Sequence, residues 1–224
     1  MNAAVDYFSI KHPLRRLATA VAYRARLKMY QLFVTLMSPK SDDKILDVGV
    51  TPDRTLKDSN FFEALYPHPS MITATSIEDA SFLEDVYPGI RFVQTDPDRL
   101  PFPDKSFDIV VSFAVLEHVG SYDNQSHFVQ ELLRVGKKVF LTTPDRAFPI
   151  EVHTFLPLIH WLPQEMHQRL LRMLKMSFWS KTENLNLLDE KTLLKLFGDS
   201  SNVVVHKNKT FGLSSNLLAV AGEK

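Results

Sequence analysis

The sequence predicts an α/β fold, and two patterns along the chain indicate it. Short apolar runs alternate with segments of helical character over residues 44–144. Runs such as "IVV" at 109–111 are apolar at every position, which is typical of strands buried on both faces of a parallel sheet. Strands that alternate with helices connect in parallel through crossovers. At 224 residues the chain can bury one substantial core, and we expect residues 1–224 to form a single domain.

The expected strands are apolar runs bounded by charged or turn-forming residues. In chain order they cover 44–49, 71–77, 90–94, 107–113, 138–142, 203–206 and 217–221. Helical spacing or a capping residue predicts helices between them, at 59–65, 78–86, 123–134 and 189–197. Residues 44–144 form the expected core, and residues 189–222 the closing helix and strands.

The N-terminal segment, residues 7–38, predicts a long amphipathic helix. Its apolar residues form one stripe at helical spacing: Leu14, Leu17, Val21, Ala25, Met29, Leu32 and Leu36. Pro13 is placed to open the helix, and Pro39 to close it. No acidic residue lies between Tyr7 and Ser41, whereas seven basic residues do. Two interpretations stay open: a helix packed on the domain with solvated cations, or a basic helix that contacts an anionic surface.

The composition excludes several classes of protein. Lysine plus arginine and aspartate plus glutamate number 26 each, so the net charge gives no argument for a nucleic-acid partner. Cysteine is absent, which excludes disulfides, thiolate metal sites and a cysteine nucleophile. No apolar stretch approaches the roughly 18 residues that span a bilayer. Arginines near the N-terminus argue against a signal peptide. We expect a cytoplasmic protein, either soluble or peripherally associated with a membrane.

Polar groups follow the expected strands at the edge where ligands bind in sheets of this kind. The first three strands are followed by Asp47 and Gly49, by Ser76 to Glu78, and by Thr95 to Pro97. The fourth strand lies between two motifs, "LPFPDKSFDIV" at 100–110, which runs into it, and "LEHV" at 116–119.

These motifs resemble the class I S-adenosylmethionine-dependent methyltransferases of the small type 11 branch. The resemblance covers roughly residues 44–144, and the ordered run at 100–110 carries it more than Asp47-x-Gly49 does. It implies a Rossmann-like, mostly parallel sheet of seven strands with helices on both faces and the last strand antiparallel. It also implies a methyltransferase whose cofactor is S-adenosyl-L-methionine.

The resemblance assigns cofactor roles residue by residue. Asp47 matches the acid that orients the methionine part of the cofactor. Gly49 matches the first glycine of the cofactor loop, which lets the backbone pass close to the cofactor, and Asp96 matches the acid that meets the adenine. With their neighbours they give the expected cofactor site: Asp47, Gly49, Val50, Thr51, Ser76, Ile77, Glu78, Asp96, Pro97 and Phe113.

The sequence departs from the family pattern at three places. Val50 to Asp53 replace the later glycines, Ser76 replaces the ribose-binding acid, and Pro97 lacks an N–H that commonly meets the adenine. Glu78 lies on the same side of an extended chain as Ser76 and can reach the ribose instead. The alternative for Glu78 is a first-turn acid of the following helix. Because the cofactor has no phosphate to cradle, we expect a reshaped, working site.

Two histidines are the candidate catalytic residues. His118 follows the fourth expected strand, and His153, beside Glu151, follows the fifth. Either can serve as a general base for a hydroxyl acceptor. The alternatives are a loop-capping role for His118 and a structural role for His153.

Residues 150–185 form the expected helical insert. The segment is apolar and basic and holds both tryptophans, which suits a lid, an oligomer contact or a membrane-interface segment. His153, His160 and His167 recur in it every seven residues, but a proline between each pair breaks a shared helix, so we expect no metal site.

The sequence therefore favours methyl transfer to a small or lipid-linked acceptor, such as an envelope glycan intermediate or another hydrophobic molecule. The alternative is a non-catalytic, methyltransferase-like subunit that binds or regulates a partner. A nucleic-acid acceptor is not expected, because the basic residues lack interleaved aromatic residues. Peripheral membrane contact and the oligomeric state stay open. We also expect residues 7–38 and 153–181 to pack together over the strand ends and roof the acceptor pocket.

Overall fold

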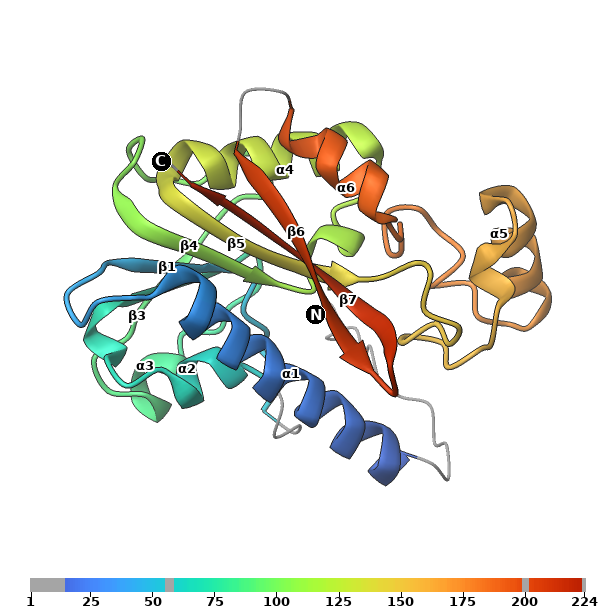
Figure 1. The fold of residues 1–224 in the computed structure, drawn as a ribbon, viewed down its shortest axis with the longest axis horizontal. Helices are drawn as coiled ribbons and strands as arrows, with labels where there is room; N and C mark the ends of the chain where they lie inside the picture. The colour runs from blue at the N-terminus through green and yellow to red at the C-terminus, as the bar shows by residue number, and fades with distance from the viewer. Residues whose placement is uncertain (1–14, 55–58, 199–201, 223–224) are drawn as a thin grey trace.

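One seven-stranded sheet runs through the molecule, in the order β3-β2-β1-β4-β5-β7-β6 (Figure 1). The structure is a computed structural model that describes residues 15–54, 59–198 and 202–222, with side chains from residue 21 onward. The strands are β1 Ile45–Val48, β2 Ile72–Ser76, β3 Arg91–Gln94, β4 Phe107–Phe113, β5 Gly136–Pro144, β6 Val203–Thr210 and β7 Leu213–Gly222. Strand β7 is antiparallel to both of its neighbours, and the other pairs are parallel. The expected mostly parallel sheet with an antiparallel last strand is confirmed.

The strand order reverses between β1 and β4. From β1 the chain builds outward to β3 on one side, and from β4 it builds outward through β5 on the other. Asp47 of β1 pairs with Ala74 of β2 and with Val111 of β4. The carboxyl ends of β1 and β4 therefore flank the crevice at which ligands bind in open α/β sheets.

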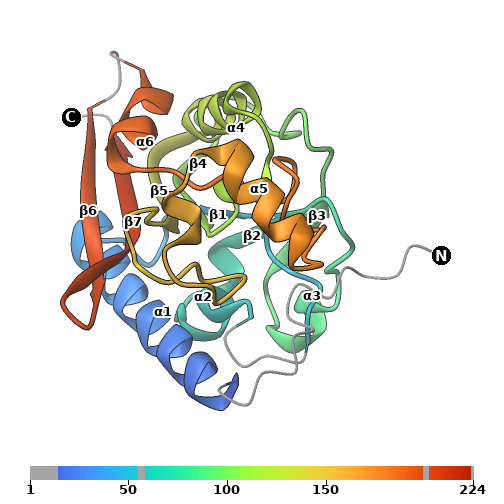
Figure 2. The same cartoon turned by 90° about the vertical axis from the view of Figure 1, so that its right-hand side faces the viewer.

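Helices cover both faces of the sheet, as Figures 1 and 2 show from two directions. They are α1 Arg15–Met37, α2 Phe61–Leu65, α3 Leu83–Val86, α4 Tyr122–Val135, α5 Gln164–Met173 and α6 Glu190–Phe197, with 3-10 turns η1 Pro69–Met71, η2 Leu116–His118 and η3 Ile159–Trp161. In β4, Ile109 and Val111 join the apolar cluster beneath α1 to α3, whereas Val110 joins the cluster beneath α4 and α6. The strand is apolar at consecutive positions because both of its faces are buried.

Helix α1 packs against β5, β6 and α2 through one buried apolar stripe. Its fully buried residues are Met29, Phe33 and Met37, at a spacing of four, while Leu32 and Leu36 lie at the edge of the stripe. The centre of the stripe is therefore shifted by one position from the expected one, because Phe33 inserts between α2 and β5. Residues 7–14 of the expected helix, and Pro13 with them, lie outside the described residues.

Three expected boundaries were wrong, one at a helix and two at a hairpin, because local turns decide where these elements begin and end. The helix expected at 78–86 covers Leu83–Val86 alone. Asp79 instead accepts a hydrogen bond from the Ser81 backbone N–H, which makes an Asx turn before the helix. The expected strand 203–206 extends to Thr210, and the strand 217–221 begins at Leu213. These two strands form a hairpin whose turn residues, Phe211 and Gly212, both have positive φ.

Residues 150–185 leave the sheet after β5 and build a small apolar cluster of their own. Leu171, Trp179 and Leu185 are its buried members. Helix α5 begins directly after Pro163, so it contains His167 but neither His153 nor His160. Figure 2 shows α5 beyond the carboxyl ends of the strands. Among the described residues, no helix is long and apolar enough to cross a membrane.

Candidate active site

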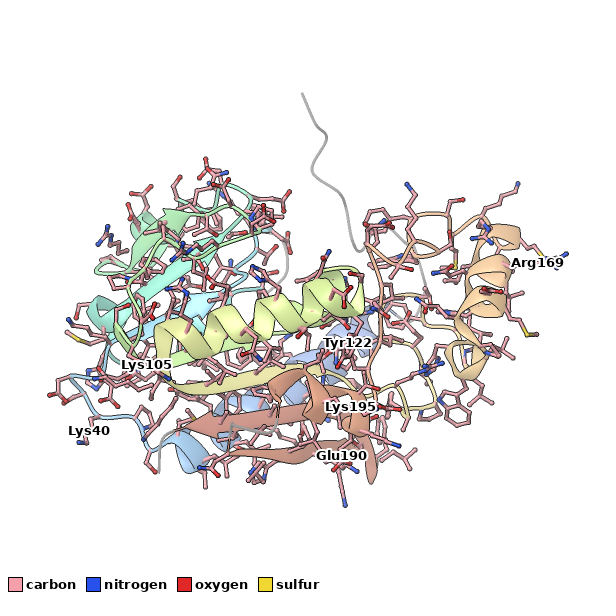
Figure 3. All side chains as sticks on the ribbon, turned by 90° about the horizontal axis from the view of Figure 1, so that it is seen from above. Lys40, Lys105, Tyr122, Arg169, Glu190 and Lys195 are labelled. Atoms are coloured by element: carbon pink, nitrogen blue, oxygen red, sulfur yellow. The ribbon has the colours of Figure 1, made fainter. Side chains whose placement is uncertain are left out.

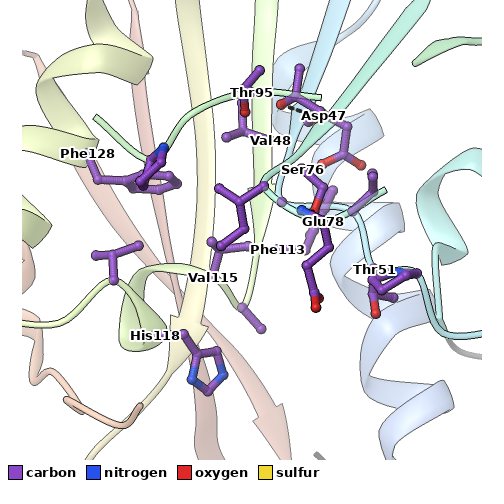
Figure 4. A pocket seen from close by; sticks show the side chains of 18 of the residues that line it. Asp47, Val48, Thr51, Ser76, Glu78, Thr95, Phe113, Val115, His118 and Phe128 are labelled. Atoms are coloured by element: carbon purple, nitrogen blue, oxygen red, sulfur yellow. Dashed lines mark hydrogen bonds between the residues drawn. The ribbon is translucent and has the colours of Figure 1, made fainter. Parts of the chain in front are cut away.

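A cavity of about 860 Å³ lies at the carboxyl ends of the strands, where the strand order reverses (Figure 4). All twelve residues predicted for the site line it. They are Asp47, Gly49, Val50, Thr51, Ser76, Ile77, Glu78, Asp96, Pro97, Phe113, His118 and His153. The fold therefore brings the expected cofactor residues and both candidate catalytic histidines around one space. Pockets for small ligands commonly have volumes of about 300–1,000 Å³.

Two buried carboxyl groups, Asp47 of β1 and Glu63 of α2, line the inner part of the cavity. Burial raises the pKa of Asp47 well above its usual range, and the neighbouring Glu63 raises it further. Burial also raises the pKa of Glu63. Neither carboxylate oxygen of Glu63 has a hydrogen-bond partner within the described part of the chain. A pair of this kind favours a bound cation, because a positive charge offsets both the burial and the mutual repulsion.

Gly49 is required by its neighbours in the fold. Its φ of +99° lies in the region that disfavours side chains, and a Cβ atom there would meet Cγ2 of Val115 at 2.3 Å. The backbone N–H groups of Gly49 and Val50 both donate to the carbonyl oxygen of Thr75, at 2.8 and 3.1 Å. The close approach that calls for glycine is thus with the loop after β4.

The loop that replaces the missing glycines is held by its own side chains. Asn60 pairs with both backbone groups of Thr51: its Oδ1 accepts from the Thr51 N–H at 3.0 Å, and its Nδ2 donates to the Thr51 carbonyl at 2.9 Å. Asp53 accepts a hydrogen bond of 2.6 Å from the Ser59 hydroxyl. Asn60 precedes α2 with no side-chain cap bond, because its amide serves the loop. Side-chain hydrogen bonds therefore fix the loop ends that are described.

Ser76 and Glu78 share a local turn after β2. The Ser76 hydroxyl accepts a hydrogen bond of 3.3 Å from the Glu78 backbone N–H. Figure 4 shows the Glu78 side chain reaching into the cavity. Since α3 begins at Leu83, Glu78 is not in the first turn of that helix, and this alternative is wrong. Ile77 lines the same edge with 61% of its surface exposed.

The loop after β3 forms the outer rim. Asp96 and Pro97 are exposed at its tip, and the Thr95 N–H donates to the Ser76 carbonyl at 2.9 Å. Farther along, the His127 ring of α4 bonds to the Asp98 carbonyl. Asp96 is therefore held at the rim by backbone bonds on both sides of it, with its carboxylate in contact with solvent.

The run "LPFPD" is tied down by one arginine of α4. Arg134 donates to the carbonyl oxygens of Leu100 and Phe102, at 2.9 and 2.8 Å, and to the Asp104 carboxylate at 2.9 Å. Glu131 pairs with Arg134 at 2.7 Å and also accepts from the Leu100 N–H at 3.0 Å. In this molecule the motif behind the family resemblance has a structural role: it anchors the rim loop to α4.

Phe113 closes the floor of the cavity as part of an aromatic group. Its ring is 4.8 Å from Phe61 and 5.5 Å from Phe62, centroid to centroid, and 5.9 Å from Phe140. Because these rings come from α2, β4 and β5, they fix the floor across three elements.

The two candidate catalytic histidines lie side by side around a buried glutamate. Their ring centroids are 4.8 Å apart. Nε2 of His118 is 3.9 Å and Nε2 of His153 is 4.0 Å from Oε1 of Glu117. His118 Nδ1 donates to the Asn184 carbonyl at 2.7 Å, and His153 Nδ1 pairs with the Glu151 carboxylate at 2.6 Å. In both rings Nδ1 is therefore oriented by an acceptor while Nε2 points toward Glu117.

The environment drives the pKa values of these groups apart. Burial raises the pKa of Glu117 to about 7, and it lowers the pKa of His118 to about 4. For Glu151 burial acts upward, but His153 and its hydrogen bonds outweigh this and lower the pKa to about 2. For His153 burial acts downward, yet the charge and hydrogen bond of Glu151 raise its pKa. His118 is therefore the neutral ring of the pair near neutral pH, and His153 is the stronger base.

The other histidines of the insert have separate places. The His160 ring bonds to the Phe148 carbonyl at 2.8 Å, and His167 is buried on α5. The seven-residue repeat therefore gathers no ligand set among the described residues. The structure brings His153 together with His118 instead, which sequence spacing did not indicate.

Sequence reasoning missed Glu63, Asn60 and the role of Arg134. A glutamate in the short run "FFEAL" carries no sign of burial, because acids in helices usually face solvent. Asn60 falls within the helix expected at 59–65, and nothing in the sequence links its amide to Thr51. Glu117 lies in the quoted "LEHV" motif, but the burial of its carboxylate depends on β5 and the insert.

Within the described residues, the expected common roof of residues 7–38 and 153–181 is not seen; residues 7–14 and the side chains before residue 21 lie outside them. Apolar residues of α1 belong to the cluster beneath α2 and α3, whereas those of the insert form their own cluster. Each segment contributes separately to the cavity wall, α1 through Arg26 and the insert through His153. The reason is that the described apolar stripe of α1 packs against one face of the sheet and is not available to the insert.

Comparison with known proteins agrees with this geometry. Residues 46–139 match the type 11 family described as "Methyltransferase domain". A probable S-adenosylmethionine-dependent methyltransferase from Mycobacterium tuberculosis is 38% identical over 63 residues, which are 27% of this chain and 22% of that relative. The matched part thus spans about a fifth of the curated relative.

Solved structures share the fold. A SAM-dependent methyltransferase from Methanosarcina mazei superposes with a TM-score of 0.56 at 19% identity, covering 84% of this chain and 96% of its own. Magnesium protoporphyrin IX methyltransferase from Synechocystis, with bound SAH, superposes with a TM-score of 0.60 at 12% identity, covering 97% and 91%. The expected fold, enzyme class and cofactor are those of this family. Residues 46–139 thus match a methyltransferase domain, and the chain as a whole has the fold of class I S-adenosylmethionine-dependent methyltransferases.

Proposed function

We propose that this protein transfers a methyl group from S-adenosyl-L-methionine to a small or lipid-linked acceptor. The observation that carries the proposal is the shared cavity. Its β1–β3 side holds the residues assigned to the cofactor, and its β4–β5 side holds His118 and His153. A cofactor and an acceptor bound in one space meet the geometric need of the reaction, which is alignment and exclusion of water.

On the cofactor side, acids are suited to three parts of the molecule. The buried pair Asp47 and Glu63 would hold the positively charged amino group of the methionine part, because the carboxylate oxygens of Glu63 have no hydrogen-bond partner among the described residues. Glu78 would accept from the ribose hydroxyls. Asp96 would accept from the adenine amino group, a contact that requires the exposed rim to close over the ring.

On the acceptor side, His153 is the proposed general base and His118 its neighbour at the wall. When bound, the cofactor supplies a methyl group already activated by a sulfonium. The protein must therefore place the acceptor oxygen and take its proton. Nε2 of His153 is suited to accept that proton, since its Nδ1 is fixed by Glu151 at 2.6 Å. An acceptor amine would need the placement alone.

The insert supports an acceptor that is hydrophobic or presented at a membrane. Trp161, Met166, Met173 and Leu174 are exposed on or beside α5, with 48 to 72% of their surfaces accessible. Exposed cations accompany them, at Arg169, Arg172 and Lys175. Figure 3 shows Arg169 on the side of α5 that faces away from the sheet. Apolar side chains ringed by cations suit the headgroup region of an anionic bilayer. Peripheral membrane contact and a cytoplasmic location are part of this proposal.

Calorimetry with three ligands tests the cofactor part. S-Adenosylmethionine and S-adenosylhomocysteine should both bind, and 5′-methylthioadenosine, which lacks the amino-acid part, should bind more weakly. Glu63→Gln should weaken S-adenosylhomocysteine about 10-fold, the loss of one charged hydrogen bond, and leave methylthioadenosine unchanged. Absence of binding by the unaltered protein would contradict the proposal.

Label transfer tests the reaction itself. A cell extract separated into organic and aqueous phases is incubated with the protein and S-adenosylmethionine labelled in its methyl group. Label should pass to a molecule in one of the phases, and the phase reports whether the acceptor is lipid-linked. Cofactor binding with label in neither phase would favour a non-catalytic subunit.

Vesicle sedimentation tests the membrane part. The protein should pellet with phosphatidylglycerol-containing vesicles at low salt and be released at high salt, because screening weakens the attraction. The triple variant Arg169→Gln, Arg172→Gln, Lys175→Gln should lose this binding. A matched variant of exposed cations on α6, Lys191→Gln with Lys195→Gln, should keep it. Equal pelleting of both variants would contradict a contact through α5.

A further inference from the structure

The acceptor side of the cavity contains a ligand set that the methyl-transfer proposal does not use fully. One ligand atom from each of Glu117, His118 and His153 lies within 4.8 Å of the other two. The set combines two imidazole nitrogens with one carboxylate oxygen. It comes from η2 and from the first turn of the insert, which are 35 residues apart in sequence but adjacent at the ends of β4 and β5.

We infer that Glu117, His118 and His153 form a binding site for one divalent first-row transition-metal ion such as Zn²⁺. Two nitrogen ligands with one carboxylate suit zinc and its neighbours in the series, whereas calcium and magnesium prefer oxygen ligands throughout. Nε2 of His118 and Nε2 of His153 are 3.9 and 4.0 Å from Oε1 of Glu117, and the three ligand atoms lie within 4.8 Å of one another. An ion in the plane of these atoms and equidistant from them would lie at most about 2.5 Å from each, against about 2.0–2.2 Å for zinc bonds. Small side-chain rotations close that difference.

The hydrogen bonds that would orient these ligands are already in place. His118 donates its Nδ1 proton to the Asn184 carbonyl, and Nδ1 of His153 is held by the Glu151 carboxylate. Metal-binding histidines nearly always have their other nitrogen oriented in this way. Oε2 of Glu117 accepts a hydrogen bond of 3.0 Å from Thr143, which fixes the carboxylate. Trp179 packs on His153 with 5.0 Å between ring centroids and limits its rotation.

An independent sign of a ligand comes from Oε1 of Glu117. This atom is buried, its side chain is fully inaccessible, and it has no hydrogen-bond partner among the described residues. A buried carboxylate oxygen without a partner is costly, and a cation in front of it removes the cost. Both histidines, but not Glu117, line the cavity, so an ion reaches the site from the acceptor side.

Only the role of the ion in methyl transfer rests on the proposed function. An ion at this place would give the acceptor an oxygen-binding partner in the cavity, and His153 would act as a ligand to it. With the ion bound, Nε2 of His153 would be a ligand and not the general base, so the proton of an acceptor hydroxyl would pass to water. In the ion-free protein His153 keeps the role of general base. The binding site itself requires no acceptor and no cofactor.

Metal binding is measured directly on the tag-free, chelator-stripped full chain. Zn²⁺ titration by calorimetry should give one ion per chain, and Co²⁺ should give the visible absorption of a nitrogen- and oxygen-ligated ion. Glu117→Gln and His153→Gln should each weaken Zn²⁺ binding by at least about 100-fold. Thr143→Val, which removes only the orienting hydrogen bond, should weaken it by about 10-fold to 100-fold.

Matched controls separate this site from adventitious binding. His68→Gln changes a histidine outside the cavity and should leave Zn²⁺ affinity and the Co²⁺ spectrum unchanged. Circular dichroism and thermal melting confirm that each variant is folded, and Glu117→Gln keeps a group that Thr143 can bond. Zn²⁺ binding by Glu117→Gln or His153→Gln equal to that of the unaltered protein would overturn the inference.

S-Adenosylhomocysteine titration of the stripped protein separates the two proposals. Cofactor binding and label transfer that persist without any Zn²⁺ or Co²⁺ binding would overturn the metal site and leave methyl transfer standing. One bound ion, lost in Glu117→Gln, with no binding of the cofactor would support the metal site while contradicting the methyltransferase function.

Discussion

The two sides of the cavity satisfy their polar groups in different ways. On the β1–β3 side, backbone groups bond to one another and to loop side chains, and Asp96 remains exposed at the rim. On the β4–β5 side, Glu117, His153 and Glu151 are closely packed in a buried network. The exposed rim of the first side can rearrange around a ligand at little cost, whereas the second side is organised before any ligand binds. The positions at which this sequence departs from the family pattern all lie on the β1–β3 side.

A single substitution should have its largest effect on the β4–β5 side, which is organised before any ligand binds. His153→Ala should lower methyl transfer by about 10²- to 10⁴-fold, because it removes the group that accepts the proton. The affinity for S-adenosylhomocysteine should change little, since His153 does not face the cofactor acids. The label-transfer assay and calorimetry measure the two quantities. A loss of less than threefold would remove His153 from the chemistry and leave that role to His118.

Gly49 tests how rigid the cofactor side is beneath its loops. Gly49→Ala should lower the free energy of unfolding by roughly 2–4 kcal/mol, because it combines backbone strain with a clash against Val115. Gly212→Ala is the matched control: its φ is also positive, at +82°, but nothing lies within 4 Å. It should cost about 1 kcal/mol. Urea denaturation measures both.

Val115→Ala in the Gly49→Ala background sharpens this prediction. Removing the Val115 methyl groups should restore part of the lost stability if the clash is the main cause. A double variant no more stable than Gly49→Ala would assign the loss to backbone strain alone.

Asp96 tests whether the exposed rim takes part in binding. Asp96→Ala should weaken S-adenosylhomocysteine and methylthioadenosine equally, by about 1–3 kcal/mol, because both ligands carry the adenine. Asp98→Ala, two residues along the same exposed loop, should leave both affinities unchanged. Calorimetric affinities decide the matter: equality of Asp96→Ala with the unaltered protein would exclude the adenine contact.

The buried acid pair gives the smallest effect, visible through pH. Burial raises the pKa values of Asp47 and Glu63 in the folded state, and the neighbouring Glu63 raises that of Asp47 further. Their contribution to stability is therefore complete at low pH and is lost as the pH rises through the raised values. Between about pH 4 and neutrality, Glu63→Gln should reduce this loss, which for one proton is at most about 1.4 kcal/mol per pH unit.

Thermal unfolding across this pH range measures the effect, with the exposed Glu165→Gln as the control. Because other carboxyls titrate in the same range, the informative quantity is the difference between Glu63→Gln and the unaltered protein. Parallel stability curves for the two proteins would show that the pair carries no proton at neutral pH.

Local sequence located the seven strands, although the last two were expected too short, and the family resemblance named residues that line the candidate site. β4 matched its expected range because consecutive apolar residues have one stable place, between two covered faces. Asp189 caps α6 as its position indicated, with Oδ1 accepting from the Thr192 N–H at 2.7 Å. The predicted site residues share a cavity because parallel strands deliver their carboxyl ends to one edge. Turns that depend on a single side chain, such as the one at Asp79, changed the helix boundaries.

By itself the sequence determined the α/β fold, the mostly parallel seven-stranded sheet implied by the family motifs, and the edge on which the site lies. Only the tertiary structure decided the partners of Glu63, Glu117 and Gly49, and the place of the insert. The periodicity of apolar residues along the sequence shows which side of a single helix or strand is buried, because that is a local property. The meeting of Glu117 with His153 requires two segments to converge at the ends of β4 and β5, and such contacts leave no periodic trace in the chain.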